Sequence, residues 1–491
     1  MSRRPPFADL ALPARPPEVD AWRWVYRALR AAILERRLKP GAQLPSTRDL
    51  ARQYGLARGT VTTAYRQLLA EGFTVAHAGA GTFVSSDLAR SKRGWSPRRG
   101  ASTPPTRVSR AAEAALGQMD LPRPLPGVGR AFRPYEPALD LFPADLWART
   151  VARVLRQASR QLYGHGDPAG YLPLRRAIAE YLGHTRGVRC SPEQVFVTSG
   201  AQQALSLIGR VLLDTGDTAW VEDPGYAPVR QAWAAAGARI VNVPVDRDGL
   251  CVSAGRALAP NARVAYVTPA NQFPLGTTMS VRRRLELLEW AAGARTWIVE
   301  DDYDAEYRFS GRPLAALQSF DRVGSVIYVG TFTKLLFNAI RLGFMVLPDG
   351  LIDYFARVRS IEDRHAPSLD QAALADFIVD GSFARHVRQM RHVYAERHDV
   401  LKDACDRRLR GILTLEAATA GMKAIGWLTR RRSDKSAATA ARSRGLEVTP
   451  VSLFAADATT PPGLILGFAG VSPDALRRGV DTLARALEQN R

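Results

Sequence analysis

The stretches Val299-Glu300-Asp301-Asp302-Tyr303-Asp304 and Gly330-Thr331-Phe332-Thr333-Lys334 decide the fold of this 491-residue chain. Each follows an apolar, β-branched run of the kind that forms a buried strand. An acid and an amine at the ends of two strands of a doubly wound sheet lie at the crevice where a cofactor binds. Pyridoxal phosphate (PLP) needs both, because a lysine forms a Schiff base with it and an aspartate pairs with its pyridinium nitrogen. The sequence therefore predicts a PLP site with Lys334 and Asp301.

The surrounding region alternates between strand-like and helical segments. Seven apolar runs with intervening helices predict an α/β large domain with a seven-stranded, mostly parallel sheet. The chain beyond Ala424 is predicted to form a smaller C-terminal α/β lobe. The predicted strands are residues 194–198, 218–222, 239–243, 264–267, 296–299, 326–329 and 343–347.

Three further groups follow strands of this predicted sheet. Gly200, Ala201 and Gln202 begin a helix directly after a strand, where free amide N–H groups can hold a phosphate. Tyr226 offers a ring suited to stacking on a flat heterocycle, and Arg341 offers a guanidinium that can clamp a phosphate. Each group alone is more typical of a surface turn. Their common position at strand ends favours one cofactor site.

The N-terminal region predicts three helices. Apolar residues at spacings of three and four predict the first over residues 20–38. Ser46 and Asp49 form a capping box that opens the second. The third runs over residues 57–71 and ends at a glycine.

Two short strand-like runs, residues 73–75 and 82–84, follow these helices around a glycine-rich turn. Three helices followed by a hairpin predict a winged helix-turn-helix. Its recognition helix enters the major groove of DNA. Arg58, Thr60 and Thr62 are predicted to be exposed at the start of that helix.

The net charge of +21 is concentrated in the first quarter of the chain. Residues 1–85 carry +7 and residues 86–133 another +7, and the remaining 358 residues share only the last +7. This distribution indicates a nucleic-acid-binding front end on a nearly neutral body. We expect a DNA-binding domain over 19–85, a basic Pro/Arg-rich linker over 86–133 and an effector domain over 134–491. The basic residues of the linker either contact DNA phosphates without sequence preference, or they have no role and the linker is a solvated spacer.

Composition excludes several other classes of protein. The three cysteines (Cys190, Cys251 and Cys405) are too scattered for a disulfide framework or a zinc site, and the seven histidines show no metal-binding spacing. We therefore expect no metal. The N-terminal residues lack the apolar stretch of a signal peptide, and no apolar segment of about 18 residues exists for a membrane span. A cytoplasmic location is expected.

The string L-K-P-G-A-Q-L-P-S-T-R-D-L-A-R-Q-Y-G-L-A-R-G-T-V-T-T-A-Y-R-Q-L-L-A-E-G-F, residues 38–73, closely resembles the DNA-binding module of GntR-type regulators. The resemblance implies that Arg48 and Arg58 contact phosphates or base edges and that Gly79 lies at the tip of the wing. Ala57 departs from the pattern, because the family usually places Ser or Thr there as the helix cap.

Residues 134–491 resemble fold-type-I aminotransferases, and the whole chain resembles the MocR subfamily of GntR-type transcriptional regulators. The strings that carry this are T-S-G-A-Q-Q-A-L, E-D-P-G-Y, T-P-A-N-Q-F-P-L-G, E-D-D-Y-D-A-E-Y, G-T-F-T-K-L-L-F and R-L-G-F. The resemblance implies that Lys334 forms the Schiff base and Asp301 pairs with the pyridinium. It implies that Tyr226 stacks on the ring and that Tyr303 and Asn271 lie beside the cofactor. Phosphate contacts are implied for Gly200, Ala201, Gln202, Thr331, Thr333 and Arg341. Tyr163 matches a tyrosine that reaches the phosphate in the neighbouring subunit, which implies a homodimer.

Three positions depart from these families. Asn271 stands where the subfamily commonly has histidine, and Asn338 where it commonly has proline. Ile465 occupies the slot in which aminotransferases place the arginine that binds the substrate α-carboxylate. Turnover of ordinary α-amino acids is therefore not expected, because their carboxylate would be left unpaired.

These observations favour a transcription factor that senses PLP, or an amine that reacts with it, and controls genes such as those of vitamin B6 or amine metabolism. One alternative is a working PLP-dependent aminotransferase with an accessory DNA-binding domain. Another is a DNA-binding protein whose cofactor site is dead. Ile465 argues against the first alternative, and the intact Lys334, Asp301 and Arg341 argue against the second.

Overall fold

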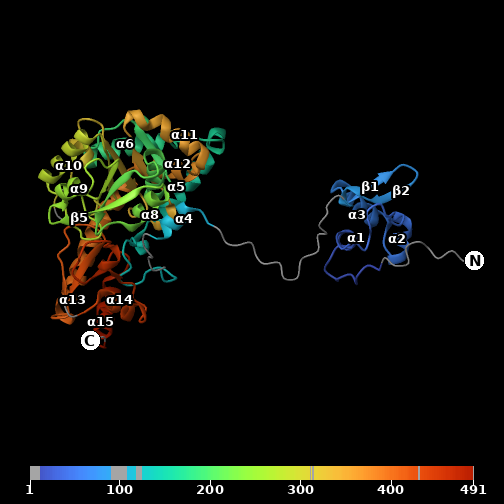
Figure 1. Cartoon of the computed structure of the whole chain (residues 1–491). Coiled ribbons are helices and arrows are strands. Elements are labelled where there is room, and N and C mark those ends of the chain that lie inside the picture. Colours follow the sequence, from blue (N-terminus) through green and yellow to red (C-terminus); the bar gives the residue numbers. More distant parts are fainter. Residues whose placement is uncertain are drawn as a thin grey trace, which may run out of the picture. The chain divides into compact units, whose positions relative to one another are not determined.

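The computed structural model describes residues 11–89, 108–117, 124–309, 311, 314–429 and 432–489. These residues form two compact units, which fall within residues 1–107 and 108–491 (Figure 1). Two parts of the predicted linker, residues 90–107 and 118–123, lie outside the described residues. Within the described ranges, none of the helices combines the length and apolar character that a bilayer span requires.

The N-terminal unit has the predicted winged helix-turn-helix. Its elements are α1 (Ala21–Leu34), α2 (Thr47–Tyr54), α3 (Arg58–Ala70), β1 (Thr74–His77) and β2 (Gly81–Val84).

Local chemistry explains where these elements begin and end. The Ser46 side chain accepts a hydrogen bond from the Asp49 amide at 3.1 Å, which confirms the predicted cap of α2. Gly55 ends α2 in the left-handed region at φ 64°. Helix α1 ends four residues earlier than expected, because Arg36 adopts a left-handed φ of 58° and turns the chain.

The C-terminal unit is built on an eight-stranded sheet in the order β3-β10-β9-β8-β7-β4-β5-β6. All seven predicted strands are present, and the eighth, β6, is a two-residue strand that pairs antiparallel with β5. Strand β10 is antiparallel to both of its neighbours. The strands are β3 (Val195–Thr198), β4 (Thr218–Asp223), β5 (Arg239–Asp246), β6 (Gly249–Leu250), β7 (Val264–Val267), β8 (Trp297–Asp302), β9 (Val326–Thr331) and β10 (Gly343–Val346).

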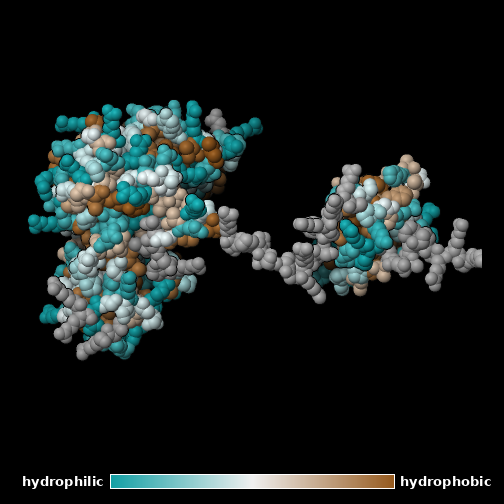
Figure 2. Space-filling view, viewed as in Figure 1, coloured by the Kyte–Doolittle hydropathy of each residue, from teal (hydrophilic) through white to brown (hydrophobic). Residues whose placement is uncertain are grey.

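Helices pack around this sheet (Figure 1). The loops at the strand ends connect the strands to these helices. In Figure 2 the visible surface of the unit is mostly hydrophilic, with apolar residues among the hydrophilic ones over α5 and α12. The helices are α4 (Arg110–Leu116), α5 (Ala144–Gln157), α6 (Leu172–Arg186), α7 (Ala201–Leu212), α8 (Ala227–Ala235), α9 (Val252–Leu258), α10 (Val281–Ala294), α11 (Ile352–Glu362) and α12 (Ser368–Val379).

A small lobe completes the unit, with an antiparallel sheet in the order β11-β12-β14-β13. It begins before the predicted boundary at Ala424, because β11 already pairs with β12. Phe132, placed in the predicted linker, is fully buried and bridges to Gly467 in β14. The elements are α13 (Ser382–Arg408), β11 (Leu413–Leu415), β12 (Lys423–Leu428), α14 (Asp434–Arg442), β13 (Thr449–Pro450), β14 (Gly463–Gly467) and α15 (Pro473–Gln489).

Candidate functional site

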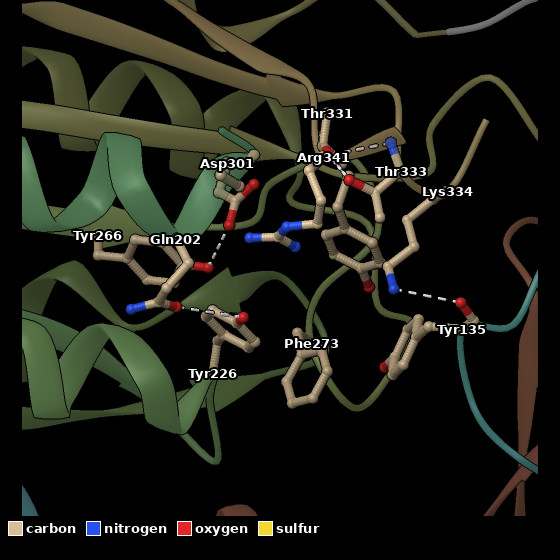
Figure 3. Close-up of a pocket in the computed structure, with 13 residues that line it drawn as sticks. Tyr135, Gln202, Tyr226, Tyr266, Phe273, Asp301, Thr331, Thr333, Lys334 and Arg341 are labelled. Atoms are coloured by element: carbon tan, nitrogen blue, oxygen red, sulfur yellow. Dashed lines mark hydrogen bonds between the residues drawn. The ribbon is translucent and has the colours of Figure 1, made fainter. Parts of the chain in front are cut away.

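A cavity of about 170 Å³ lies where β8 and β9 end (Figure 3). The two strands are parallel, with Asp301 in register with Val329, so the residues that follow both strands emerge at one edge of the sheet. Ten of the predicted cofactor-binding residues line this cavity together. They are Gly200, Ala201, Gln202, Tyr226, Asp301, Tyr303, Thr331, Thr333, Lys334 and Arg341.

The amino group of Lys334 is buried in the wall of this cavity. Its Nζ donates a hydrogen bond to the backbone oxygen of Tyr135 at 3.2 Å and lies 5.6 Å from the centre of the Tyr135 ring. Burial lowers the pKa of Lys334 to about 8, although the Asp304 and Glu136 carboxylates act to raise it. A useful fraction of the amine is therefore neutral near neutral pH, the form that attacks a carbonyl.

Asp301 is buried at the opposite side of the cavity. Its Oδ2 accepts a hydrogen bond from the Tyr266 hydroxyl at 2.7 Å. Its Oδ1 is buried and has no hydrogen-bond partner among the described residues. Burial raises the pKa of Asp301 to about 7, and the carboxylates of Asp302 and Asp304 add to this rise. An unpaired buried carboxylate oxygen fits a cationic N–H donor of a ligand.

A second group of side chains can hold an anion. Gly200 caps helix α7 at φ 93° and ψ 169°, and Gly200, Ala201 and Gln202 at this helix start line the cavity, where the first amides of a helix have no intrahelical acceptor. The hydroxyls of Thr331 and Thr333 lie 2.8 Å apart. Arg341 donates to the Ser199 backbone oxygen at 2.9 Å, which positions its guanidinium beside the helix end. Free amides, hydroxyls and a guanidinium together match a phosphate.

Three aromatic residues line the cavity that sequence reasoning did not place there: Tyr135, Tyr266 and Phe273. Tyr135 stacks on Phe273, with ring centres 5.4 Å apart. Phe273 meets Tyr226 edge to face at 5.4 Å. This row of rings forms an apolar wall against which a flat heterocycle can pack.

Asn271 and Tyr163 do not line the cavity. The Asn271 side chain donates to Asp304 at 2.8 Å, and its place among the cofactor-binding residues stays a prediction. Its backbone oxygen instead accepts a hydrogen bond from the Tyr303 hydroxyl at 2.8 Å. Tyr163 is 63% exposed. Its predicted contact is with another subunit and stays a prediction.

The position of the missing arginine is apolar in this chain. Ile465 is fully buried in β14 and packs in a cluster with Ala227, Phe273 and Phe454. Lys334 and Arg341 are the cations among the described residues that line the cavity. Arg341 donates to the Ser199 backbone oxygen and Lys334 to the Tyr135 backbone oxygen.

The predicted DNA-binding residues lie in the N-terminal unit on α2, α3 and the wing. Arg48 and Arg58 are exposed, and neither forms an ion pair with a described residue. Arg58 directs its Nε to the Thr47 hydroxyl at 3.4 Å. Thr60 and Thr62 were predicted to be exposed but are half-buried, and the Thr62 hydroxyl donates to the Arg58 backbone oxygen at 2.9 Å.

The wing and the start of α3 complete this surface. Gly79 lies in the turn between β1 and β2 at φ 77°. Ala57 caps α3 without a side-chain hydrogen bond, so it offers the first amides of that helix no side-chain acceptor. Exposed cations beside a free helix N-terminus are suited to phosphate contacts.

Comparison with known families divides the chain in the same way. Residues 23–84 match the bacterial regulatory proteins of the gntR family, and residues 138–483 match aminotransferase class I and II. The chain is 42% identical over 475 residues to the probable rhizopine catabolism regulatory protein MocR of Rhizobium meliloti, covering 96% of this chain and 95% of the relative. It is 30% identical over 460 residues to the pyridoxine biosynthesis transcriptional regulator PdxR of Corynebacterium glutamicum, covering 91% and 92%.

Among solved structures, the chain is similar to LysN, the α-aminoadipate aminotransferase of Thermus thermophilus. The TM-score is 0.70 at 28% identity, covering 76% of this chain and 96% of LysN. The LysN crystal contains N-(5'-phosphopyridoxyl)-L-leucine. The fold of the C-terminal unit is therefore that of the class I and II aminotransferases.

Proposed function

Because the chain belongs to the MocR subfamily of GntR-type transcriptional regulators, we propose that it binds PLP covalently through Lys334 and uses the bound cofactor to control its binding to DNA. The observation that supports this most is the unpaired, buried Oδ1 of Asp301 in the same cavity as the Lys334 amine. When bound, PLP supplies an electron-poor ring with an aldehyde that condenses with amines. Lys334 would provide the amine, Asp301 would hold the ring nitrogen, and Arg341 with the end of α7 would hold the phosphate.

Reduction with borohydride tests this assignment. We expect the protein reconstituted with PLP to be yellow, and borohydride followed by peptide mapping to find the phosphopyridoxyl group on Lys334. Lys334→Ala should abolish both signals. Lys423→Ala is the matched control, because Lys423 is also a buried lysine whose pKa burial lowers to about 8, yet it does not line this cavity. A label on another residue would refute the site.

We infer that the cofactor serves signalling and not turnover. Ile465 leaves the α-carboxylate of an ordinary amino acid without a cation in the usual position. Such an acid would lose affinity, since a buried unpaired carboxylate is costly. Any amine effector would therefore not be a standard α-amino acid in the usual pose.

The rival function is a working aminotransferase with an accessory DNA-binding domain. The comparison that separates them is DNA affinity with and without PLP, in wild type and Lys334→Ala, beside a transaminase assay over common amino donors. If the protein is a sensor, PLP should change the DNA affinity of the wild type and leave the DNA affinity of Lys334→Ala unchanged. Turnover on the order of 10 s⁻¹, with DNA affinity indifferent to PLP, would favour the enzyme.

DNA recognition is proposed to use the N-terminus of α3 in the major groove, with Arg58, Thr60 and Thr62 at the bases or adjacent phosphates. Arg48 would contact the backbone, and Gly79 would bring the wing close to the minor groove. The exposed guanidiniums of Arg48 and Arg58, which form no ion pair with a described residue, support this placement. Footprinting of Arg58→Ala on the operator is the test, and an unchanged footprint would place a different helix in the groove.

The functional form is proposed to be a homodimer that binds paired half-sites. Large apolar side chains are exposed on the C-terminal unit, including Tyr354 at 64%, Ile361 at 85% and Val379 at 76%. Burying them against a second copy would remove this apolar surface from water. Tyr163 is proposed to reach the partner's phosphate site. Analytical ultracentrifugation tests the dimer, and weaker PLP binding by Tyr163→Phe tests the shared site.

The effector and target genes are proposed to belong to amine or vitamin B6 metabolism. The relatives named for rhizopine catabolism and pyridoxine biosynthesis support this choice. Sequencing of genomic DNA captured by the purified regulator would identify the operators, and sites unrelated to such genes would refute it.

A further inference from the structure

Residues 130–136, here called the Tyr135 segment, connect the region that follows the N-terminal unit in sequence to the cofactor cavity. Two of its non-glycine residues have left-handed backbones, Phe132 at φ 69° and Tyr135 at φ 63°. Such conformations are costly for bulky side chains, and they persist only where surrounding contacts hold them. The contacts of the Tyr135 segment therefore show which residues keep its backbone in this conformation.

The first half of the segment is held by the small lobe. Phe132 is fully buried in the core that includes that lobe and bridges to Gly467. Arg133 donates to Glu447 at 2.7 Å and also contacts Glu136 at 3.4 Å. These anchors involve no residue of the cofactor cavity.

The second half is held at the cavity by Lys334. The Tyr135 backbone oxygen accepts the Lys334 Nζ at 3.2 Å, and the Tyr135 ring covers the amine. The Tyr135 ring also packs on Phe273 and Tyr303, with ring centres 5.4 Å and 5.8 Å apart, so apolar contacts help to hold the residue. The contact with Lys334 is made through the Tyr135 backbone carbonyl.

The Lys334 amine and Asp301 lie on different sides of the cavity. In Figure 3 the Lys334 amine points to Tyr135, whereas Asp301 lies on the other side beyond Arg341. An amine joined to a ring between Asp301 and the end of α7 would have to turn from Tyr135 toward that ring.

Resting on the proposed function, we propose that the hydrogen bond from Lys334 to the Tyr135 carbonyl is a clasp that Schiff-base formation opens. In that reaction the protonated amine and the aldehyde give a protonated imine and one water, so the nitrogen keeps one hydrogen and loses two with the aldehyde oxygen. An amine effector that takes over the aldehyde carbon returns the free amine to Lys334 and closes the clasp again. Tyr135 is thus a positioning residue, because its carbonyl is hydrogen-bonded to Lys334 only while the Lys334 amine is free.

The Tyr135 segment lies between the cofactor cavity and the N-terminal unit in the sequence, so a change in the segment could affect DNA binding. Residues before it lead back in sequence through α4 to the N-terminal unit, and α4 packs against α8. Helix α8 begins directly after Tyr226 of the cavity wall. Both contacts of the connecting region described here therefore lie next to the cofactor cavity.

Hydrogen–deuterium exchange of the full chain tests the clasp. Without PLP, the amides of the Tyr135 segment should exchange about tenfold faster in Lys334→Met than in wild type, because a hydrogen bond to a charged group is lost. PLP should accelerate exchange in wild type by a similar factor and leave Lys334→Met unchanged.

A control variant separates the clasp from general loosening. Lys423→Met removes another buried amine, one that donates to the Pro274 backbone oxygen, and should leave the Tyr135 segment and its response to PLP as in wild type.

The possible failures are distinguishable. A Schiff base trapped on Lys334 with no change in exchange of the Tyr135 segment would overturn the clasp alone. Equal acceleration in Lys334→Met and Lys423→Met would also overturn it, because the effect would not depend on this bond. Absence of any Schiff base at Lys334 would overturn the proposed function and the clasp together.

Discussion

Gly200→Ala should weaken PLP binding through the backbone. Gly200 has φ 93° and ψ 169°, a conformation that is essentially restricted to glycine. A side chain there costs about 1–3 kcal/mol, which corresponds to about 5- to 150-fold in an equilibrium. The added Cβ would lie 3.6 Å from the Arg341 guanidinium, an ordinary contact, so strain and not collision is the main effect. Relieving that strain requires rotation of the peptides that aim the first amides of α7 at the phosphate.

We therefore expect PLP affinity, measured by absorbance titration, to fall by about 5- to 150-fold in Gly200→Ala. Gly216→Ala is the matched control, because Gly216 has φ 96° and nothing within 4 Å of an added Cβ. It should lower the free energy of unfolding in urea by a comparable amount without changing PLP affinity. If Gly200→Ala bound PLP as tightly as Gly216→Ala, the helix end would not be part of the cofactor site.

Three further predictions concern charge. Since burial lowers the pKa of Lys334 to about 8, the rate of Schiff-base formation should rise with pH up to about 8 and then level off, and a flat stopped-flow profile would contradict this. Burial raises the pKa of Asp301 and Asp304 to about 7, so between about pH 4 and 7 the folded protein keeps protons that the unfolded chain has lost. The free energy of unfolding without PLP, measured by urea denaturation, should therefore fall as the pH rises from about 4 to 7. Arg58→Ala should weaken specific operator binding by about 1–3 kcal/mol in gel-shift titrations with the PLP spectrum unchanged, whereas Arg52→Ala, an exposed arginine of α2 already beside Asp49, should have little effect.

The parts of the site that follow single strands could be predicted from the sequence. Asp301 and Lys334 each follow an apolar run, and such a run can be recognised from neighbouring residues alone. Gly200 was predictable for the same reason, because a glycine between a strand and an amphipathic helix indicates a phosphate-binding turn. The capping box at Ser46 and the hairpin of the wing are likewise local patterns.

The rest depends on contacts between distant segments. Tyr135 and Lys334 are separated by 199 positions, and nothing around Tyr135 marks it as part of a cavity wall. Tyr266 reads as one more core residue of an apolar strand, although its hydroxyl meets Asp301. Asn271 was named as a cofactor-binding residue from resemblance, and its contact with the buried carboxylate of Asp304 could not be read from the sequence. The start of the small lobe was misplaced because β11 and Phe132 join it only in three dimensions.

The charges of the cavity suit it to a ligand that could shift the protein between two states, as the proposed function requires. Burial raises the pKa of Asp301 to about 7 and lowers that of Lys334 to about 8, so each charge is costly at neutral pH while it lacks a partner. A ligand with a cationic ring at one end and a phosphate at the other would meet Asp301 at the first and Arg341 with α7 at the second. Such a ligand stabilises only the folded form that holds these groups together. If the ligand also draws Lys334 from Tyr135, as proposed, the stabilised form would differ in the segment that leads back in sequence to the DNA-binding unit. A differential affinity of this kind is what a ligand needs to shift a regulator between two states.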